Sequence, residues 1–178
     1  MTKRFHITGA SGAGTTTLGA HLALALDAPH HDTDSYYWMP TDPPYRDKRP
    51  VPERLSLMQQ LFVPQERWVL SGSCMGWGDS LIAHFDLVVL LTIPTDLRMA
   101  RLKQREHDHY GDRIAPRGDM AEAHAAFMDW AGRYDDPDFT SRSRRRHLAW
   151  CKSLTCPVLH LDSTAPVADL VASIKATL

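Results

Sequence analysis

The sequence has few cysteines, almost no net charge and no long hydrophobic run. Its three cysteines, Cys74, Cys151 and Cys156, have no CxxC spacing, so we expect reduced thiols rather than a disulfide framework or a cysteine metal site. The formal net charge of −1 gives the chain as a whole no attraction to nucleic acid or to an anionic membrane. The longest apolar run, residues 85–93, contains polar residues and is too short to span a bilayer. We therefore expect neither nucleic acid nor membrane as a partner.

Signals for export, repeats and linkers are also absent. Residues 1–5 lead directly into a strand-like pattern, without an apolar signal segment, which predicts a cytoplasmic protein. Hydrophobic residues make up 43% and charged residues 23% of the chain, as in ordinary globular proteins. A length of 178 residues suits one domain with a sizeable core. The sequence does not indicate an oligomeric state.

Short apolar runs alternate with helix-like stretches along the chain, which is typical of βαβ units. The patterns predict strands at residues 5–8, 29–32, 68–71, 87–93 and 158–161. They predict helices at residues 15–26, 51–62, 94–107, 119–133 and 141–153 and after Pro166, with a mobile loop at residues 108–118. The expected architecture is a single α/β domain over residues 1–178, with a five-stranded parallel sheet between helices on both faces.

A glycine-rich loop joins the first strand to the first helix. Residues 9–17 read Gly-Ala-Ser-Gly-Ala-Gly-Thr-Thr-Thr. Glycines let the backbone approach an anion, successive N–H groups form a nest for phosphate oxygens, and the helix N-terminus adds positive charge. The spacing and the strand–loop–helix context predict a phosphate loop. The alternative is a glycine-rich turn without a ligand. The residues predicted to bind the phosphates of a nucleoside triphosphate are Gly9, Ser11, Gly12, Ala13, Gly14, Thr15, Thr16 and Thr17.

One position of the loop departs from the usual pattern G-x-x-x-x-G-K-[ST]. Thr15 stands where the pattern has lysine, and its short, uncharged side chain cannot reach the outer phosphates. The backbone nest remains, and the hydroxyl of Thr16 or Thr17 can help to hold Mg²⁺. Two explanations are open: an arginine from elsewhere closes on the phosphates, or catalysis has been lost.

Arginines that can supply the missing charge follow the fourth strand. Arg98, Arg101 and Arg105 share one helix face. The alternative is a solvated face on which they pair with nearby carboxylates, those of Asp96, Glu106 and Asp108. A second group, Arg142, Arg144, Arg145 and Arg146, has few acidic neighbours in sequence. Arginines stabilise the charge of a transferring phosphoryl group. We therefore predict an arginine-bearing lid at residues 106–146, with Arg101, Arg105 and Arg142 in catalytic roles.

Two carboxylates follow the second strand, at an edge of the sheet where ligands bind in open parallel sheets. Asp34 is predicted to position the acceptor or to take its proton, and Asp32 to contact the acceptor and, with Thr16, the metal ion. A helix cap or turn residue is the alternative for Asp34. His30 and His31 are not predicted to form a metal site, because adjacent strand residues point to opposite faces.

The segment after the third strand reaches the same edge of the sheet. Gly72 permits close backbone approach, Trp77 can stack on a planar ring, and Asp79 can accept hydrogen bonds. The alternative is a tight loop with an anchoring tryptophan. Trp38 adds a further stacking surface within a predicted acceptor-binding region, residues 33–66. Its segment 36–54 carries the basic trio Arg46, Lys48 and Arg49, which can meet a phosphate on the acceptor; the alternative for this segment is an ordinary surface excursion.

Together these residues resemble the adenylate kinase-like group of P-loop kinases, which includes nucleoside monophosphate, shikimate and gluconate kinases. The matches are residues 9–17, 32–34, 71–72 and 85–91 and the arginines of residues 98–105. The resemblance implies strand order 2-3-1-4-5, Mg·ATP as donor, an acceptor region between strands two and three, and an arginine-bearing lid after strand four. The chain departs from the group at Thr15 and at Ser71, where many members have an acidic residue that orients Mg²⁺.

The leading hypothesis is a kinase that transfers the γ-phosphoryl group of Mg·ATP to a small acceptor. A nucleoside or nucleotide is the first choice of acceptor, because Tyr36, Tyr37, Trp38 and Trp77 offer stacking surfaces. The alternative is a nucleotide-binding regulatory module or a slow NTPase. Thr15 and Ser71 favour this alternative, whereas the arginine groups favour the kinase.

Overall fold

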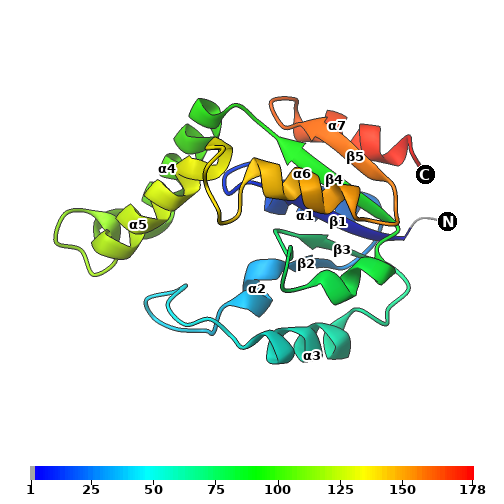
Figure 1. The fold of residues 1–178 in the computed structure, drawn as a ribbon, viewed down its shortest axis with the longest axis horizontal. Helices are drawn as coiled ribbons and strands as arrows, with labels where there is room; N and C mark the ends of the chain where they lie inside the picture. The colour runs from blue at the N-terminus through cyan, green and yellow to red at the C-terminus, as the bar shows by residue number, and fades with distance from the viewer. Residues whose placement is uncertain (1–2) are drawn as a thin grey trace.

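A computed structural model describes residues 3–178 of the chain; Met1 and Thr2, which belong to the N-terminal segment considered above, lie outside the described residues. Five parallel strands form one sheet in the order β2-β3-β1-β4-β5 (Figure 1). The order implied by the family resemblance is therefore confirmed, as is the predicted three-layer α/β/α fold. The strands are β1 (Arg4–Gly9), β2 (His30–Asp32), β3 (Trp68–Ser71), β4 (Leu87–Thr92) and β5 (Val158–Asp162).

One face of the sheet is covered by α1 (Thr15–Ala25) and α7 (Val167–Lys175). Phe5 and Ile7 of β1 point to this side and pack with Leu18 and Leu22 of α1, all fully buried. Strand residues alternate between faces, so the intervening His6 is buried on the other side. The central strand β1 therefore needs apolar cover on both faces, as buried parallel strands do.

The other face is covered by α3 (Val51–Leu61), the 3-10 turn η1 (Asp79–His84) and α6 (Arg144–Lys152). Met58 and Trp150 bring α3 and α6 into the core around Leu70 and Leu90 of the sheet. Within residues 3–178 the three cysteines are unpaired, with Cys74 and Cys151 buried among these side chains. No helix in this part of the chain combines the length and apolar character needed to cross a bilayer.

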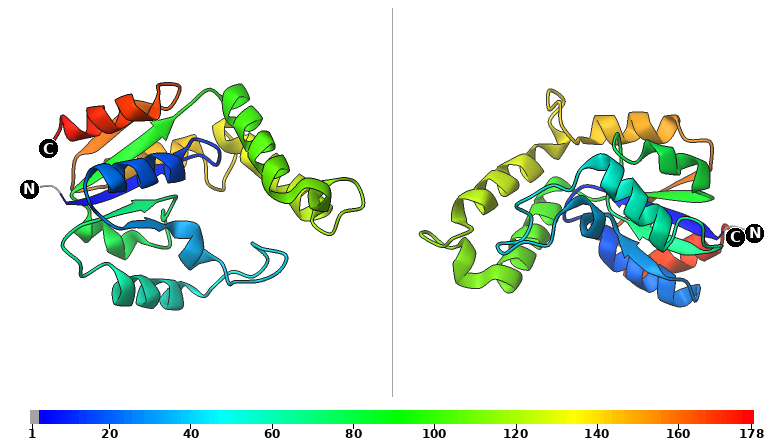
Figure 2. Two further views of the ribbon diagram at one scale, coloured as in Figure 1. Left: turned by 180° about the vertical axis from the view of Figure 1, so that it is seen from behind. Right: turned by 90° about the horizontal axis from the view of Figure 1, so that it is seen from below.

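Two helices extend beyond the sheet as an arm, residues 95–132, made of α4 (Thr95–Tyr110), the turn η2 (Gly111–Ile114) and α5 (Ala121–Gly132). Figures 1 and 2 show the arm on the same side of the molecule as the loop between α2 and α3. Helix α4 continues to Tyr110, so the predicted start of a loop at residue 108 is wrong. A side-chain hydrogen bond from Gln104 to Asp108, one turn apart, supports the added turn, and the helix ends at Gly111, which has φ +47°.

A short helix, α2 (Thr33–Tyr37), follows β2 and was not predicted. The Asp32 carboxylate caps it by accepting a 2.9 Å hydrogen bond from the backbone N–H of Asp34. The capping residue is therefore Asp32, and Asp34 lies in the first turn, where its side chain is free of a capping role. The turn η3 (Arg133–Asp135) joins the arm to the segment before α6.

Candidate functional site

The phosphate loop has the backbone that its glycines were expected to permit. Gly12 and Gly14 have φ of +84° and +89°, in the left-handed region that side chains disfavour. A Cβ at residue 12 would lie 2.8 Å from the carbonyl oxygen of Arg98, so the first turn of α4 packs closely on the loop. A Cβ at residue 14 would meet no protein atom, so only its backbone conformation requires glycine there. Gly14 is also the residue before α1, whose N-terminus faces the loop.

Thr16 and Asp32, the predicted metal pair, are in direct contact. The Thr16 hydroxyl donates a 2.7 Å hydrogen bond to Asp32 Oδ2, and Ser71 Oγ lies 3.3 Å from the same oxygen. A hydroxyl and a carboxylate side by side beside a phosphate loop fit Mg²⁺, which takes one or two protein oxygens and keeps several waters. Ser71, in the place of an acidic residue, also contacts His30 Nε2 at 2.9 Å. The carboxylate of this site thus comes from β2 rather than from β3.

Asp34 lies where charges of both signs meet. Its side chain is accessible to solvent, yet desolvation by the surrounding protein raises the pKa of its carboxyl, and the neighbouring charge of Asp32 raises it further. Arg142, Arg105 and the indole of Trp38 act in the opposite direction. A carboxylate with a raised pKa is better matched to accepting a proton near neutral pH.

Arg142 contacts the phosphate loop from a distant part of the chain. Its Nη2 donates a 2.6 Å hydrogen bond to the Ser11 hydroxyl. The guanidinium carbon lies 4.7 Å from the centre of the Trp130 ring. Burial lowers the pKa of Arg142, while the charge of Asp34 raises it. The structure thus places Arg142 against the phosphate loop, and its catalytic role stays a prediction.

The other predicted arginines take different positions. Arg101 Nη1 donates to the Ser163 carbonyl oxygen after β5, at 3.1 Å, and Arg105 forms an ion pair with the adjacent Glu106 at 2.8 Å. Few acidic partners were expected for the arginines of residues 142–146. This holds only in part, because Arg144 Nη1 lies 3.6 Å from the carboxylate of Asp135, which precedes that segment. Of the four predicted catalytic residues, Arg142 and Arg105 both lower the pKa of the third, Asp34, whereas Arg101 contacts the turn after β5.

Arg98 was left without a specific role by sequence reasoning. Its side chain is 1% exposed, and Nη1 donates to the carbonyl oxygens of Ser11 at 3.3 Å and Ala131 at 2.9 Å. Nη2 lies 3.8 Å from Asp135. The residue therefore ties the phosphate loop to the end of α5. Its helical spacing with Arg101 and Arg105 gave no sign that it alone would be buried.

The loop after β3 has contacts that favour the anchoring alternative for two of its predicted ligand residues. The Trp77 indole donates to the Ser73 carbonyl oxygen at 3.2 Å, and Asp79 Oδ1 accepts from the backbone of Gly76 and from the Trp150 indole, both at 2.9 Å. Gly72 has φ +96°, and a Cβ there would collide with the Thr33 hydroxyl. The close backbone approach predicted for Gly72 is thus to α2.

Aromatic residues beside Asp34 surround a second buried arginine that sequence reasoning missed. Arg54 of α3 is 5% exposed, and its guanidinium carbon lies 3.8 Å from the Tyr37 ring centre and 5.2 Å from that of Trp77. Trp38 packs edge-on against Tyr37. Within residues 3–178 Arg54 forms no ion pair, so its charge is not neutralised by a neighbouring carboxylate.

A buried histidine connects the loop after β3 with the segment between the arm and α6. His147 of α6 contacts Ser73 Oγ through Nε2, at 2.9 Å, and Tyr134 OH through Nδ1, at 2.7 Å. Burial lowers its pKa to about 3, and the nearby charge of Arg142 contributes. The neutral ring thus joins the β3 loop to the segment that carries Arg142. Residues 73, 134 and 147 are far apart in sequence, so no local pattern could have identified this contact.

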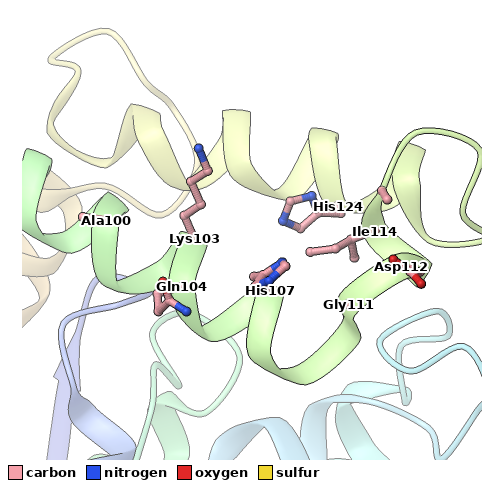
Figure 3. A pocket seen from close by; sticks show the side chains of 9 residues that line it. Ala100, Lys103, Gln104, His107, Gly111, Asp112, Ile114 and His124 are labelled. Carbon is pink, nitrogen blue, oxygen red and sulfur yellow. The ribbon is translucent and has the colours of Figure 1, made fainter.

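The arm also contacts the flap, which we define as residues 38–50. Arg113 Nη2 lies 2.7 Å from Asp42 of the flap and 2.7 Å from Asp119 of the arm itself. A hollow of about 440 Å³ lies between α4 and α5, where His107, His124 and Lys103 line it (Figure 3). It includes no residue of the phosphate loop. Nowhere in residues 3–178 do three or more histidine, cysteine or carboxylate side chains form a metal-binding group.

Known structures share this fold over nearly the whole chain. A shikimate kinase from Bacteroides thetaiotaomicron matches with a TM-score of 0.59 and 15% identity, covering 99% of this chain and 98% of that one. A sugar kinase from Janibacter sp. matches with a TM-score of 0.54 and 14% identity, over 99% and 94%. A gluconokinase from Sinorhizobium meliloti matches with a TM-score of 0.50 and 16% identity, over 98% and 90%. The fold is thus that of the P-loop kinases related to adenylate kinase.

No protein-family model matches the chain. A curated protein does: the uncharacterized protein YqaC of Bacillus subtilis (strain 168) is 43% identical over 171 residues, covering 96% of this chain and 94% of its own length. Identity of this extent over nearly the full length of both chains exceeds what a shared fold alone requires, as the structural neighbours above illustrate. The chain belongs to the same family as YqaC.

Proposed function

We propose that the protein is a kinase that transfers the γ-phosphoryl group of Mg·ATP to a hydroxyl group of a small, anionic acceptor. The observation that carries the proposal is the 2.7 Å hydrogen bond between Thr16 and Asp32. It joins the phosphate loop to the end of β2, two residues before Asp34, so donor and acceptor groups share one site. Kinases among the structural neighbours are consistent with this reading.

Residues 12–17 form the donor half of the proposed site. Their backbone N–H groups and the N-terminus of α1 favour phosphate oxygens. Thr16 and Asp32 would hold Mg²⁺, which would neutralise charge on the outer phosphates. The chain itself contributes the nest, the two oxygens and the positive charge of nearby guanidinium groups. The unpaired cysteines are in keeping with a cytoplasmic location, where ATP is available.

Asp34 is the proposed base. The acceptor hydroxyl oxygen forms a bond to the γ-phosphorus, the bond between the γ-phosphorus and the β–γ bridging oxygen breaks, and ADP leaves. The hydroxyl proton moves to the Asp34 carboxylate, whose pKa is raised by desolvation and by Asp32. Each atom of the transfer is then accounted for without a further reactant.

Arg54 supports an anionic group on the acceptor. It is buried beside Asp34's helix without an ion pair to residues 3–178, and a carboxylate or phosphate would neutralise it. The stacking surface for a nucleoside has weaker support, because the guanidinium of Arg54 already stacks on Tyr37 at 3.8 Å and Trp38 packs against the same ring. We therefore place sugar acids and sugar phosphates ahead of nucleosides.

The whole chain would act as one kinase domain, with residues 33–66 binding the acceptor and residues 106–146 serving as lid. The contact of Arg113 with Asp42 supports this division, since it connects the arm with the flap. Closure of a lid excludes water and completes the catalytic group of residues.

The test is a coupled assay of ADP release with Mg·ATP and a panel of sugar acids, sugar phosphates, nucleosides and nucleoside monophosphates. We expect one acceptor to stimulate release, and Asp34→Asn to reduce that turnover by on the order of 10²- to 10⁴-fold. The exposed Asp169→Asn of α7 serves as the matched control and should turn over like the wild type. ATP binding without stimulation by any acceptor class would instead support the regulatory module, and a basal release that no acceptor changes would support a slow NTPase.

A further inference from the structure

The phosphate loop lacks its own cation. Residue 15 is a threonine, and a Thr side chain neither carries charge nor spans the loop. The two residues that follow, Thr16 and Thr17, are also uncharged. A triphosphate held by this loop would face amides and hydroxyls only, unless a basic side chain arrives from another element. A transferring phosphoryl group needs such charge.

Three other arginines near the site already have partners, although within residues 3–178 Nε and Nη2 of Arg98 form no hydrogen bond and its charge is met by Asp135 alone. Arg98 Nη1 donates to two carbonyl oxygens, and its Nη2 lies near Asp135. Arg101 contacts Ser163 beyond β5, and Arg105 pairs with Glu106 at 2.8 Å. These contacts describe structural ties rather than a charge available to a ligand.

Arg142 differs from these three in its partner and in its charge balance. It reaches the loop through the Ser11 hydroxyl, a neutral group, at 2.6 Å. Among residues 3–178 it forms no ion pair within 4.0 Å, and its Nε is buried without a hydrogen-bond partner. The guanidinium thus keeps an unneutralised charge and spare donor capacity against the phosphate loop.

Neighbouring contacts hold Arg142 in place. The guanidinium lies over Trp130, whose indole donates to Ser141 Oγ at 3.1 Å, one residue before Arg142. Ser143, one residue after it, caps α6 by accepting from the backbone N–H of Arg146. A side chain that is already held in place loses little conformational entropy when it binds a ligand. A lysine at the start of α1 would have the same advantage.

The charges of Arg142 and Asp34 act on each other's pKa, so the two side chains belong to the same site. Arg142 thus contacts the donor loop through Ser11 and lies within electrostatic reach of the proposed base. A γ-phosphoryl group in transfer occupies the space between these two. We infer that Arg142 takes the place of the lysine missing at residue 15, binding the γ-phosphate of the donor and stabilising its charge during transfer. This inference rests on the proposed kinase function.

The experiment compares four proteins: wild type, Arg142→Gln, Thr15→Lys and the double variant Thr15→Lys/Arg142→Gln. Calorimetry measures the affinity for Mg·ATP and for Mg·ADP, and the coupled assay measures ADP release. Arg145→Gln is the matched control, since Arg145 is exposed and belongs to the same arginine run. Arg142→Lys, with thermal melting of every variant, covers the case in which Arg142→Gln does not fold.

We expect Arg142→Gln to weaken ATP binding by on the order of 10- to 100-fold while ADP binding changes little. Turnover should fall by about 10³-fold or more. Lysine at residue 15 should restore most of both losses in the double variant but give no gain in the presence of Arg142, because two cations would compete for one phosphate. Arg142→Lys should retain more preference for ATP over ADP than Arg142→Gln does.

Three outcomes would overturn the inference: an ATP affinity in Arg142→Gln no lower than in Arg145→Gln, equal loss for ATP and ADP, or no recovery in the double variant. The last, combined with a higher KM for the acceptor alone, would assign Arg142 to the acceptor. Failure of the wild type to bind any triphosphate would be a different result, because it would contradict the proposed function itself.

Discussion

Acidification from pH 8 to pH 5 should destabilise the protein through two buried histidines. His6 and His147 are both fully buried, and desolvation lowers the pKa of His6 to about 4 and that of His147 to about 3. His6 contacts the Leu70 carbonyl oxygen through Nδ1, at 3.2 Å, and the Cys74 sulfur through Nε2, at 3.6 Å. These partners suit the neutral ring. Both rings should therefore stay neutral in the folded protein at pH 5.

The magnitude follows from the difference between the folded and unfolded states. An unfolded histidine, with a pKa of 6.5, gains about 2 kcal/mol by protonation at pH 5, and the folded residue gains almost none. Because the folded pKa is the lower one, stability is fully present above pH 6.5 and falls as the pH decreases toward 4. Two histidines give a loss of about 4 kcal/mol at pH 5, a large part of the ~5–15 kcal/mol typical of a domain.

Other groups modify this figure without changing its sign. Burial also lowers the pKa of His30 and of His31, which adds to the loss. The raised pKa of Asp34 acts in the opposite direction, because a carboxyl that protonates more readily in the folded state recovers stability as the pH falls.

The assay is urea unfolding followed by circular dichroism at pH 8 and pH 5, for the wild type and for His147→Gln. The variant loses one titrating group, so its free energy of unfolding should change by about 2 kcal/mol less between the two pH values. His160→Gln, at an exposed position of β5, should behave like the wild type. A stability that does not change between pH 8 and pH 5, or an equal effect of His147→Gln and His160→Gln, would refute the reasoning.

Three further changes probe the site. Gly72→Ala should lower the free energy of unfolding in urea by on the order of 3 kcal/mol, because a Cβ at this φ of +96° would collide with Thr33. Gly76→Ala, with φ +82° and open space around the added Cβ, should lower it by about 1 kcal/mol. Equal losses would contradict the close approach of Gly72 to α2. Mg²⁺ should increase the affinity for ATP, and Thr16→Val should reduce this increase by roughly tenfold, whereas Thr17→Val should leave it unchanged. The same loss in both variants would argue against the Thr16–Asp32 pair as the metal site. Arg113→Ala should change the stability of the fold little, because its ion pair with Asp42 is exposed, but should make the flap more sensitive to proteolysis. Unchanged cleavage would show that the contact with Asp42 does not hold the flap.

Much of the fold could be predicted because it depends on local patterns. The apolar run of β4 and the glycine loop before α1 are continuous stretches of sequence, so each could be recognised by itself. The family resemblance supplied the strand order. The sequence also assigned Thr16 and Asp32 to one site, since the loop before α1 follows the end of β1 and Asp32 ends β2.

The remaining features depend on contacts between distant residues. Arg98 and Arg101 have the same helical context, yet one is buried against the phosphate loop and the other contacts the turn after β5. The bond of Asp79 to Trp150 spans 71 positions, and that of Arg142 to Ser11 spans 131. Which of several arginines approaches an anion is decided by the packing of the arm and α6, and no period or spacing in the sequence records that packing.

The most direct test of the account is a calorimetric titration of the wild-type protein with the magnesium complexes of ATP, GTP, CTP and UTP. The main-chain amides of residues 12–17, the Thr16–Asp32 pair and Arg142 together predict saturable binding of at least one triphosphate, at one site per chain and more tightly than the corresponding diphosphate. Absence of binding for all four, in a protein that melts cooperatively, would contradict the account.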